Sequence, residues 1–243
     1  MNRGINMLAV AASDVLVIAE HSTLKYPPLI LLPSCRPAEK HNTSAWAADN
    51  STLYLASSHT ISRYDLSSKQ LVALYTPDDG YIQCLAVKDK STIIYGAQCN
   101  IYVLECGGQK PIVAQSFGPY KHDILSLSLS NDTTLLACGL SNAAYVQNLT
   151  TGSQTTLRGL PSKSSITICT FHPHVRTRLL VGSGDQLLMY DTTQPSTPIK
   201  IIPMNDAGIC IQAIACSPFS KTLVAVAMSD GGVGLIDLDK EKG

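Results

Sequence analysis

The stretch ITICTFHPHVRTRLLVGSGDQLLMYDTTQPSTPIKII, from Ile166 to Ile202, decides the fold. It holds four short apolar runs that turn-forming residues separate, and these runs are Ile166–Phe171, Leu179–Gly182, Leu187–Asp191 and Ile199–Ile202. The first run ends at a proline-containing segment, because proline has no N–H to donate to a strand ladder. Short runs rich in β-branched and apolar residues between glycine, proline and aspartate are typical of strands. The stretch therefore predicts one four-stranded antiparallel sheet.

A polar residue that closes the third run recurs along the whole chain. It is acidic or an amide, and it stands at Glu20, Asp65, Glu105, Asn148, Asp191 and Asp237. The spacings are 45, 40, 43, 43 and 46 residues. A run rich in small residues precedes each position, as in LLACGL and LLVGSG. A period of this length with four strand-like runs per period predicts a β-propeller.

The repeat predicts an all-β fold with about six recognisable blades in a single domain that spans residues 1–243. The expected blades cover about 1–34, 41–76, 79–116, 121–158, 163–203 and 207–243. The first blade lacks an inner strand and the last lacks an outer strand, so 22 strands are expected, which is not a multiple of four. We therefore expect an incomplete seven-bladed ring, and we expect that this chain alone does not close it.

Composition limits the classes of partner. The chain has 45% hydrophobic and 15% charged residues, with 18 basic and 18 acidic side chains and no long run of one sign. A nucleic-acid or anionic-membrane binder usually carries a basic patch, so we expect neither partner. No apolar run approaches the ~18 residues that a membrane-spanning helix needs. Most of the eight cysteines lie inside apolar strand runs, which favours free thiols and an intracellular, cytoplasmic protein.

The pattern around the repeated polar residue resembles the WD-repeat family. Tyr64-Asp65 and Tyr190-Asp191 stand where that family has its Trp-Asp pair, and His41 and His122 stand at its glycine-histidine pair. Leu104-Glu105 departs further from the family pattern, as do two other blades. The resemblance covers nearly the whole chain and implies a WD-repeat-like β-propeller that binds other proteins.

Within that family, three parts of the chain are most similar to the GCP-WD proteins, which carry the γ-tubulin ring complex to centrosomes and spindles. These parts are ISRYDLSSKQL (Ile61–Leu71), the divergent fourth blade, and the run from Ser164 through CSPFSKTLVAVAMSDGGVGLIDLDKEK. The resemblance implies a non-catalytic adaptor for microtubule nucleation, located at the centrosome or spindle pole, with γ-tubulin complex or centrosomal partners. The alternative is a scaffold or substrate receptor of another intracellular complex, in ubiquitin ligation or ribosome assembly.

Catalytic and metal sites are weighed against simpler roles. Cys169, His172 and His174 form the one close cluster of ligand types, yet a turn separates the thiol from the imidazoles and no fourth ligand is near. A buried thiol beside a His-Pro turn is the preferred interpretation. Ser183 lacks the strand-turn-helix setting of a hydrolase nucleophile. We expect no enzyme, no cofactor and no metal.

Partner-binding residues are expected at one face of the propeller. The turns between second and third strands emerge there together with the segments that join blades. Residues at these turns and segments are Asp14, His41, His59, Asn100, His122, Asn142, Asp185 and Asp230. The alternative role for those at the turns is turn formation, because Asn and Asp tolerate the left-handed backbone conformation.

Overall fold

The computed structural model describes residues 7–12, 15–20, 30–33, 41–47, 51–78, 80–161, 167–204 and 208–240 of the 243-residue chain, with side chains from residue 43 onward. These residues contain strands and turns but no α-helix. The chain divides into two compact units, Met1–Gly118 and Pro119–Gly243. The expectation of one domain for all blades stays a prediction.

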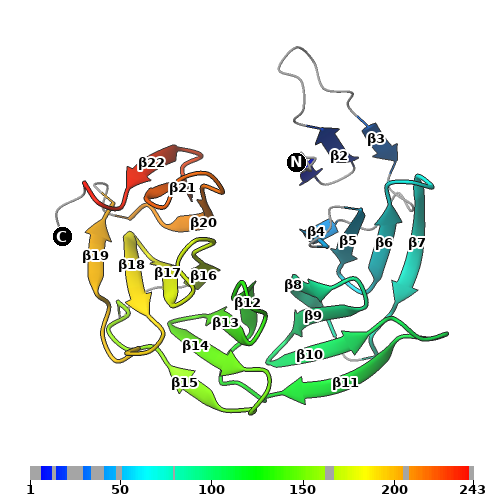
Figure 1. Cartoon of the computed structure of the whole chain (residues 1–243), viewed down its shortest axis with the longest axis horizontal. Helices are drawn as coiled ribbons and strands as arrows, with labels where there is room; N and C mark the ends of the chain where they lie inside the picture. The colour runs from blue at the N-terminus through cyan, green and yellow to red at the C-terminus, as the bar shows by residue number, and fades with distance from the viewer. Residues whose placement is uncertain are drawn as a thin grey trace. The chain divides into compact units, whose positions relative to one another are not determined.

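The first unit contains three antiparallel sheets (Figure 1). The first sheet has the order β1 (Met7–Ala12), β2 (Val15–Glu20), β3 (Ile30–Pro33). The second has the order β4 (His41–Trp46), β5 (Thr52–Ser57), β6 (Ile61–Asp65), β7 (Gln70–Tyr75). The third contains β8 (Ile82–Asp89), β9 (Thr92–Ala97), β10 (Asn100–Glu105) and β11 (Ile112–Phe117).

The second unit also contains three antiparallel sheets. One has the order β12 (Ile124–Leu129), β13 (Leu135–Leu140), β14 (Ala143–Asn148), β15 (Gln154–Thr156). The next has the order β16 (Thr167–Phe171), β17 (Arg178–Ser183), β18 (Gln186–Asp191), β19 (Lys200–Pro203). The last contains β20 (Ile211–Cys216), β21 (Leu223–Met228) and β22 (Val233–Asp237).

These sheets confirm the all-β fold class and the sheet topology expected from the repeat. Each sheet consists of consecutive strands, and no strand is shared between sheets among the described residues. The first and last sheets have three strands each, and the others have four. The four runs expected between Ile166 and Ile202 are β16 to β19, and their ends differ from expectation by no more than one residue. The incomplete ring stays a prediction.

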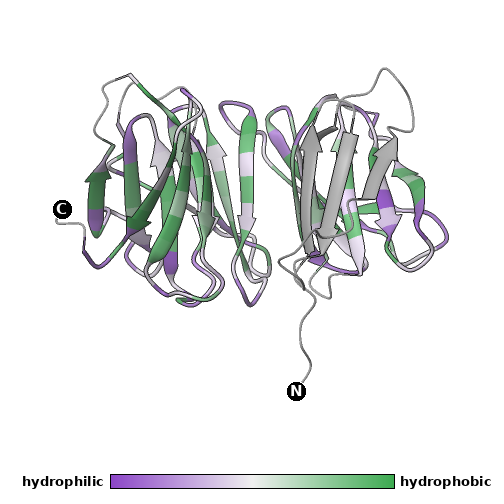
Figure 2. Cartoon of the chain, turned by 90° about the horizontal axis from the view of Figure 1, so that it is seen from above, coloured by the Kyte–Doolittle hydropathy of each residue, from purple (hydrophilic) through white to green (hydrophobic). Residues whose placement is uncertain are grey.

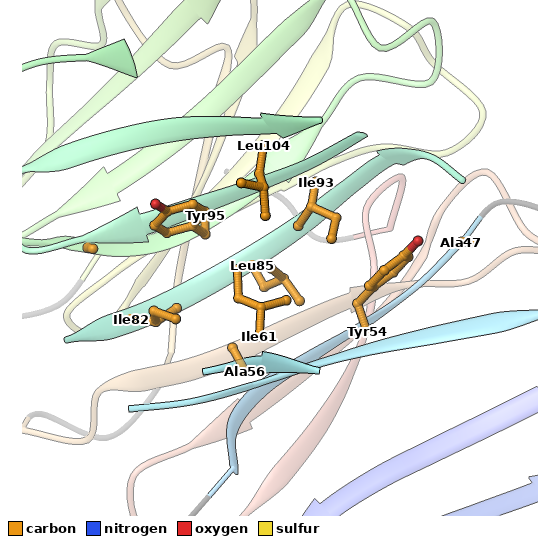
Figure 3. Close-up of a cluster of buried hydrophobic side chains, with 10 residues drawn as sticks. Ala47, Tyr54, Ala56, Ile61, Ile82, Leu85, Ile93, Tyr95 and Leu104 are labelled. Carbon is orange, nitrogen blue, oxygen red and sulfur yellow. The ribbon is translucent and has the colours of Figure 1, made fainter. Parts of the chain in front are cut away.

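The second strands explain why the sequence shows near-continuous apolar runs. All six residues of β5 are buried, and β9, β13 and β17 each have five buried residues in a row. A strand has a near-continuous apolar sequence when other sheets cover both of its faces. Between the second and third sheets of the first unit, Tyr54, Ile61, Ile82, Tyr95 and Leu104 belong to one buried cluster (Figure 3). In the second unit the strands are likewise mostly hydrophobic (Figure 2).

The inner strands of the second unit are joined by side-chain hydrogen bonds to backbone. On β12, the Ser126 hydroxyl donates to the Thr167 carbonyl oxygen at 3.2 Å and accepts from the Cys169 N–H at 3.0 Å. A Cβ on Gly139 would lie 2.0 Å from the same Thr167 oxygen, so the two sheets approach closely at this glycine. The Ser128 hydroxyl likewise accepts the Phe171 N–H at 2.9 Å, so two of the alternating serines of ILSLSLS bind the next sheet instead of facing solvent.

Candidate interaction surface

Each sheet of four antiparallel strands has two ends with different connections. The turn between its second and third strands lies at the same end as the segment that leads to the next sheet, and we name this end the connecting edge. In the described chain it comprises residues 58–60, 76–78, 80–81, 98–99, 118–123, 141–142, 157–161, 184–185, 204, 208–210 and 229–232. The other two turns of each sheet form the hairpin edge, at 47, 51, 66–69, 90–91, 106–111, 130–134, 149–153, 172–177, 192–199, 217–222 and 238–240.

In the first unit, His59 and Tyr81 form an aromatic pair on the connecting edge. Their ring centroids are 6.1 Å apart with planes at 87°, and both side chains are exposed. The backbone holds the pair in place, because the N–H of Ile82 donates to the carbonyl oxygen of Ser58 at 2.9 Å. The sequence pattern indicated His59 but not Tyr81. The pair offers a partner an apolar ring beside an imidazole.

Asn100 has a different environment from the exposed pair. It is the first residue of β10 and is half-buried. Its side-chain oxygen lies against Gly118, where a Cβ would be only 2.5 Å away. Asn100 therefore packs on the segment that leaves the third sheet, and less of it is available to a partner.

In the second unit, three consecutive sheets each place one expected residue at the same type of turn. Asn142 and Asp230 are exposed, whereas Asp185 is half-buried. The carboxylate of Asp230 accepts the N–H of Gly232 at 2.8 Å, and the backbone oxygen of Asp185 accepts the N–H of Met204 at 2.8 Å. His122 is half-buried in the segment before β12. The structure therefore brings Asn142, Asp185 and Asp230 to one edge of the second unit.

The turn-making role expected for these residues is correct only in part. Of the five described turn residues, Asn142 alone has a positive φ, at 59°. Near the other turns the left-handed residues are Gln98, Gly184 and Gly231, with φ values of 50°, 60° and 88°. Backbone conformation therefore does not explain the polar side chains at these other turns. Asp14 lies outside the described residues, as does the side chain of His41, which begins β4.

The repeated polar residue has a structural role at the hairpin edge. The Asp65 carboxylate accepts the N–H groups of Ser67 and Ser68, both at 2.9 Å. The Asn148 amide oxygen and the Asp191 carboxylate accept equivalent N–H groups two residues later, both at 2.9 Å. A side chain that binds its own backbone in this way fixes a turn. Glu105, whose side chain is one methylene longer, is exposed at the same position.

Hydrogen bonds at this edge also hold carboxylates ionised. The hydroxyl of Ser67 is the main cause that lowers the pKa of Asp65 to about 2, and the hydroxyl of Ser130 does the same for Asp132. Asp132 also forms an ion pair with Arg176 of the next sheet. A carboxylate that accepts several hydrogen bonds favours its charged form. Asp65 and Asp132 are therefore engaged within the fold.

His172 joins two hairpin-edge turns and has no free ring nitrogen. Its Nδ1 accepts the N–H groups of His174 at 3.1 Å and Val175 at 3.2 Å, so the proton is on Nε2, which donates to the Lys221 carbonyl oxygen at 2.9 Å. Burial lowers the pKa of His172, and burial raises the pKa of Cys169 to about 12. The zinc alternative for this cluster has no geometric support, because no three His, Cys, Asp or Glu side chains of the described chain gather around a metal position.

Further structural features bear on other classes of function. A surface notch of about 300 Å³ lies at the hairpin edge of the third sheet, where Glu105, Lys110 and Ile112 line it. These three side chains are exposed, so the notch does not have the buried converging groups typical of an active site. Within the described residues, no helix has the length and apolar character to span a bilayer.

Comparison with known proteins gives the fold. No family model matches the chain, and no curated protein matches it. A chain in the crystal structure of the mitotic checkpoint complex superposes with a TM-score of 0.80 at 14% identity, covering 96% of this chain and 72% of that chain. This likeness identifies the fold as a WD-repeat β-propeller. In all, 1446 solved chains match, and a fold this common does not by itself select a function.

Proposed function

We propose that this protein is a non-catalytic scaffold in which the connecting edges of the sheets of each unit bind other proteins. The observation that carries the proposal is the contrast between the two edges. Asp65 of the hairpin edge caps its turn and Asp132 pairs with Arg176 of the next sheet, whereas His59, Tyr81 and Asn142 are exposed on the connecting edge. Polar and aromatic side chains on rigid turns are suited to protein recognition.

For the identity of the partner, we favour the γ-tubulin ring complex. The support is the resemblance of Ile61–Leu71, of the divergent fourth blade and of the run from Ser164 onward to the GCP-WD proteins. In this proposal the chain is the targeting part of an adaptor for microtubule nucleation, in the cytoplasm at the centrosome or spindle pole. The alternative partner is another intracellular assembly that uses a WD-repeat scaffold, in ubiquitin ligation or ribosome assembly.

The experiment is quantitative affinity purification of the tagged chain from dividing cells. The test variant carries His59→Ala, Tyr81→Ala and Asn142→Ala on the connecting edge. The matched control carries Lys69→Ala and Gln109→Ala, two exposed positions on the hairpin edge. Circular dichroism of both purified variants checks that each is folded.

We expect the wild type and the control to recover the same proteins, including γ-tubulin complex subunits, and the test variant to lose them. Recovery of ubiquitin ligase or ribosome-assembly subunits in place of γ-tubulin subunits would replace the favoured partner by the alternative. A folded test variant that recovers the same proteins as the wild type would refute binding through the connecting edge.

A further inference from the structure

On the connecting edge of the first unit, the turn that carries His59 is closed by two hydrogen bonds. The N–H of Ser57 donates to the Thr60 carbonyl oxygen at 2.9 Å, and the N–H of Thr60 donates to the Ser57 hydroxyl oxygen at 3.1 Å. The imidazole therefore keeps its place beside Tyr81, whose ring stands almost perpendicular to it, at 87°. Tyr81 is 46% exposed, so part of its ring is open to solvent beside the imidazole.

The segment that carries Tyr81, residues 76–81, is held in place as well. Pro77 is buried, and its ring fixes the backbone angle φ. Gly80 has a φ of 88°, and a Cβ at this position would lie only 2.5 Å from Nε2 of Gln98. A residue with a side chain would be strained there, so the glycine lets the segment pack closely on the neighbouring turn. A partner that binds this segment therefore loses little free energy in ordering it.

Asp78 gives the same segment a negative charge that no described base compensates. It is exposed and stands three residues before Tyr81, so the two Cα atoms are at most about 11 Å apart. The ion pairs of the described chain do not involve Asp78. The sequence places a second acid, Asp79, directly after it. No lysine or arginine occurs in the described part of this edge of the first unit, which comprises residues 58–60, 76–78, 80–81, 98–99 and 118.

The combination of an open tyrosine ring and an uncompensated carboxylate selects one kind of side chain. The face of an aromatic ring attracts a cation, and a carboxylate accepts two parallel N–H groups from a guanidinium. Arginine satisfies both groups at once, because its guanidinium is planar, always charged and weakly hydrated. An acidic side chain would be repelled by Asp78, and an apolar one would leave this carboxylate without a partner.

We propose that Tyr81, His59 and Asp78 form a recognition site for an arginine side chain of a partner protein. The guanidinium stacks on the open part of the Tyr81 ring, and its N–H groups donate to the Asp78 carboxylate. His59 contacts the Tyr81 ring from one side and keeps it in position. The inference rests on the proposed function, since it names the chemistry by which the connecting edge of the first unit binds its partner.

The test is a nuclear magnetic resonance titration of the full chain, labelled with ¹⁵N, with the peptide acetyl-Gly-Arg-Gly-amide. The backbone N–H resonances of Gly80, Tyr81 and Ile82 report on the site. The matched probe is the same peptide with citrulline in place of arginine, because citrulline has a similar shape without the charge. The test variants are Asp78→Asn and Tyr81→Leu. The control variant is Glu105→Gln, which neutralises an exposed acid on the hairpin edge of the same unit.

We expect the arginine peptide to shift these three resonances in a saturable manner and the citrulline peptide to leave them unchanged. Asp78→Asn and Tyr81→Leu should each raise the dissociation constant about two- to fivefold, which corresponds to the loss of an exposed ion pair or of a cation–π contact. Glu105→Gln should leave the dissociation constant unchanged. Circular dichroism checks that each variant is folded.

Three results would overturn the arginine site: no saturable shift at these resonances, equal shifts with the citrulline peptide, or an equal loss of affinity in Glu105→Gln. The titration does not depend on which protein is the partner. Its failure therefore removes the arginine site alone, whereas unchanged recovery of proteins by the triple variant of the connecting edge removes the proposed function.

Discussion

Replacing Leu180 by alanine tests the register of the repeat in the second unit. Leu136, Leu180 and Val224 are all fully buried. They are not equivalent, however: the registers pair Leu135, Arg178 and Leu223 with the repeated polar residue, so Leu180 corresponds to Ala137 and Ala225, one residue away from the position of Leu136 and Val224. Leu180 lies in the cluster between the sheet of β16–β19 and the last sheet, where Leu187 and Ile211 also belong.

The size of the effect follows from the burial. Alanine removes three carbons, and burying each is worth about 0.8 kcal/mol, or about 2.4 kcal/mol in total. The neighbouring strands are held by hydrogen bonds on both sides, so they cannot collapse into the space, and a cavity remains. Leu→Ala changes with such cavities cost roughly 2.7–5.0 kcal/mol. We therefore expect Leu180→Ala to lower the free energy of unfolding by about 3–4 kcal/mol.

The assay is urea unfolding followed by far-ultraviolet circular dichroism, with hydrogen exchange of the β17 amides as a local readout. Trp46 lies in the first unit, so its fluorescence does not report directly on this site. The control is Ile199→Ala, a residue that is 56% exposed just before β19. A loss for Leu180→Ala below about 0.5 kcal/mol, or equal to that of the control, would refute the register.

Three further predictions concern the second unit. Gly139→Ala should lower the free energy of unfolding by more than about 2 kcal/mol, because its Cβ would clash with the Thr167 carbonyl oxygen. Gly234→Ala should leave that free energy nearly unchanged in the same urea assay, because no atom lies within 4 Å of its Cβ position. Folding lowers the pKa of His172 from 6.5, so the unfolded chain binds the proton more readily than the folded chain. The contribution of neutral His172 to the stability of the fold is therefore complete above about pH 6.5 and is lost as the pH falls through the pKa of the folded state. The urea midpoint of unfolding should therefore decrease as the pH is lowered from about 7.5 to about 5. An equal decrease in the His172→Gln variant would contradict protonation of His172 as the cause. Asp191→Ala should lower the melting temperature more than Asp191→Asn, which keeps the oxygen that accepts the Thr193 N–H, and equal shifts would refute the capping role.

Most of the fold could be predicted because its signals are local. Apolar runs, small residues and turn formers lie within a few positions of one another, and their repeat from Glu20 to Asp237 fixes the number and order of strands. The role of Asp65 and Asp191 as turn caps is also local. Asp65 accepts the N–H groups of the residues two and three positions later, and Asp191 accepts the N–H of the residue two positions later. The expected fold class and sheet topology are accordingly confirmed.

The candidate surface could be predicted only in outline. The repeat places His59, Asn142 and Asp230 at equivalent turns, but it does not indicate Tyr81, whose ring meets His59 from the start of the next sheet. Nor does it show that Asn100 packs on Gly118. The first contact joins two neighbouring sheets across 22 positions, and the second joins the ends of the paired strands β10 and β11 across 18 positions, so the geometry of both depends on pairing and packing between segments apart in the sequence.

The sequence by itself determined the strands, their antiparallel order and the turns, because these depend on side-chain periodicity and on backbone preferences of single residues. Tertiary structure decided which polar groups are consumed inside the fold and which surfaces stay open. Ser126 binds the next inner strand and His172 holds the turn at Lys221, although both look like ordinary turn or surface residues in the sequence. The apolar run of β22 reads like any buried strand, and only the packing of sheets shows that Val233 and Leu235 are exposed. The physical reason is that burial and hydrogen-bond partners are set by contacts between sheets, which no local pattern encodes.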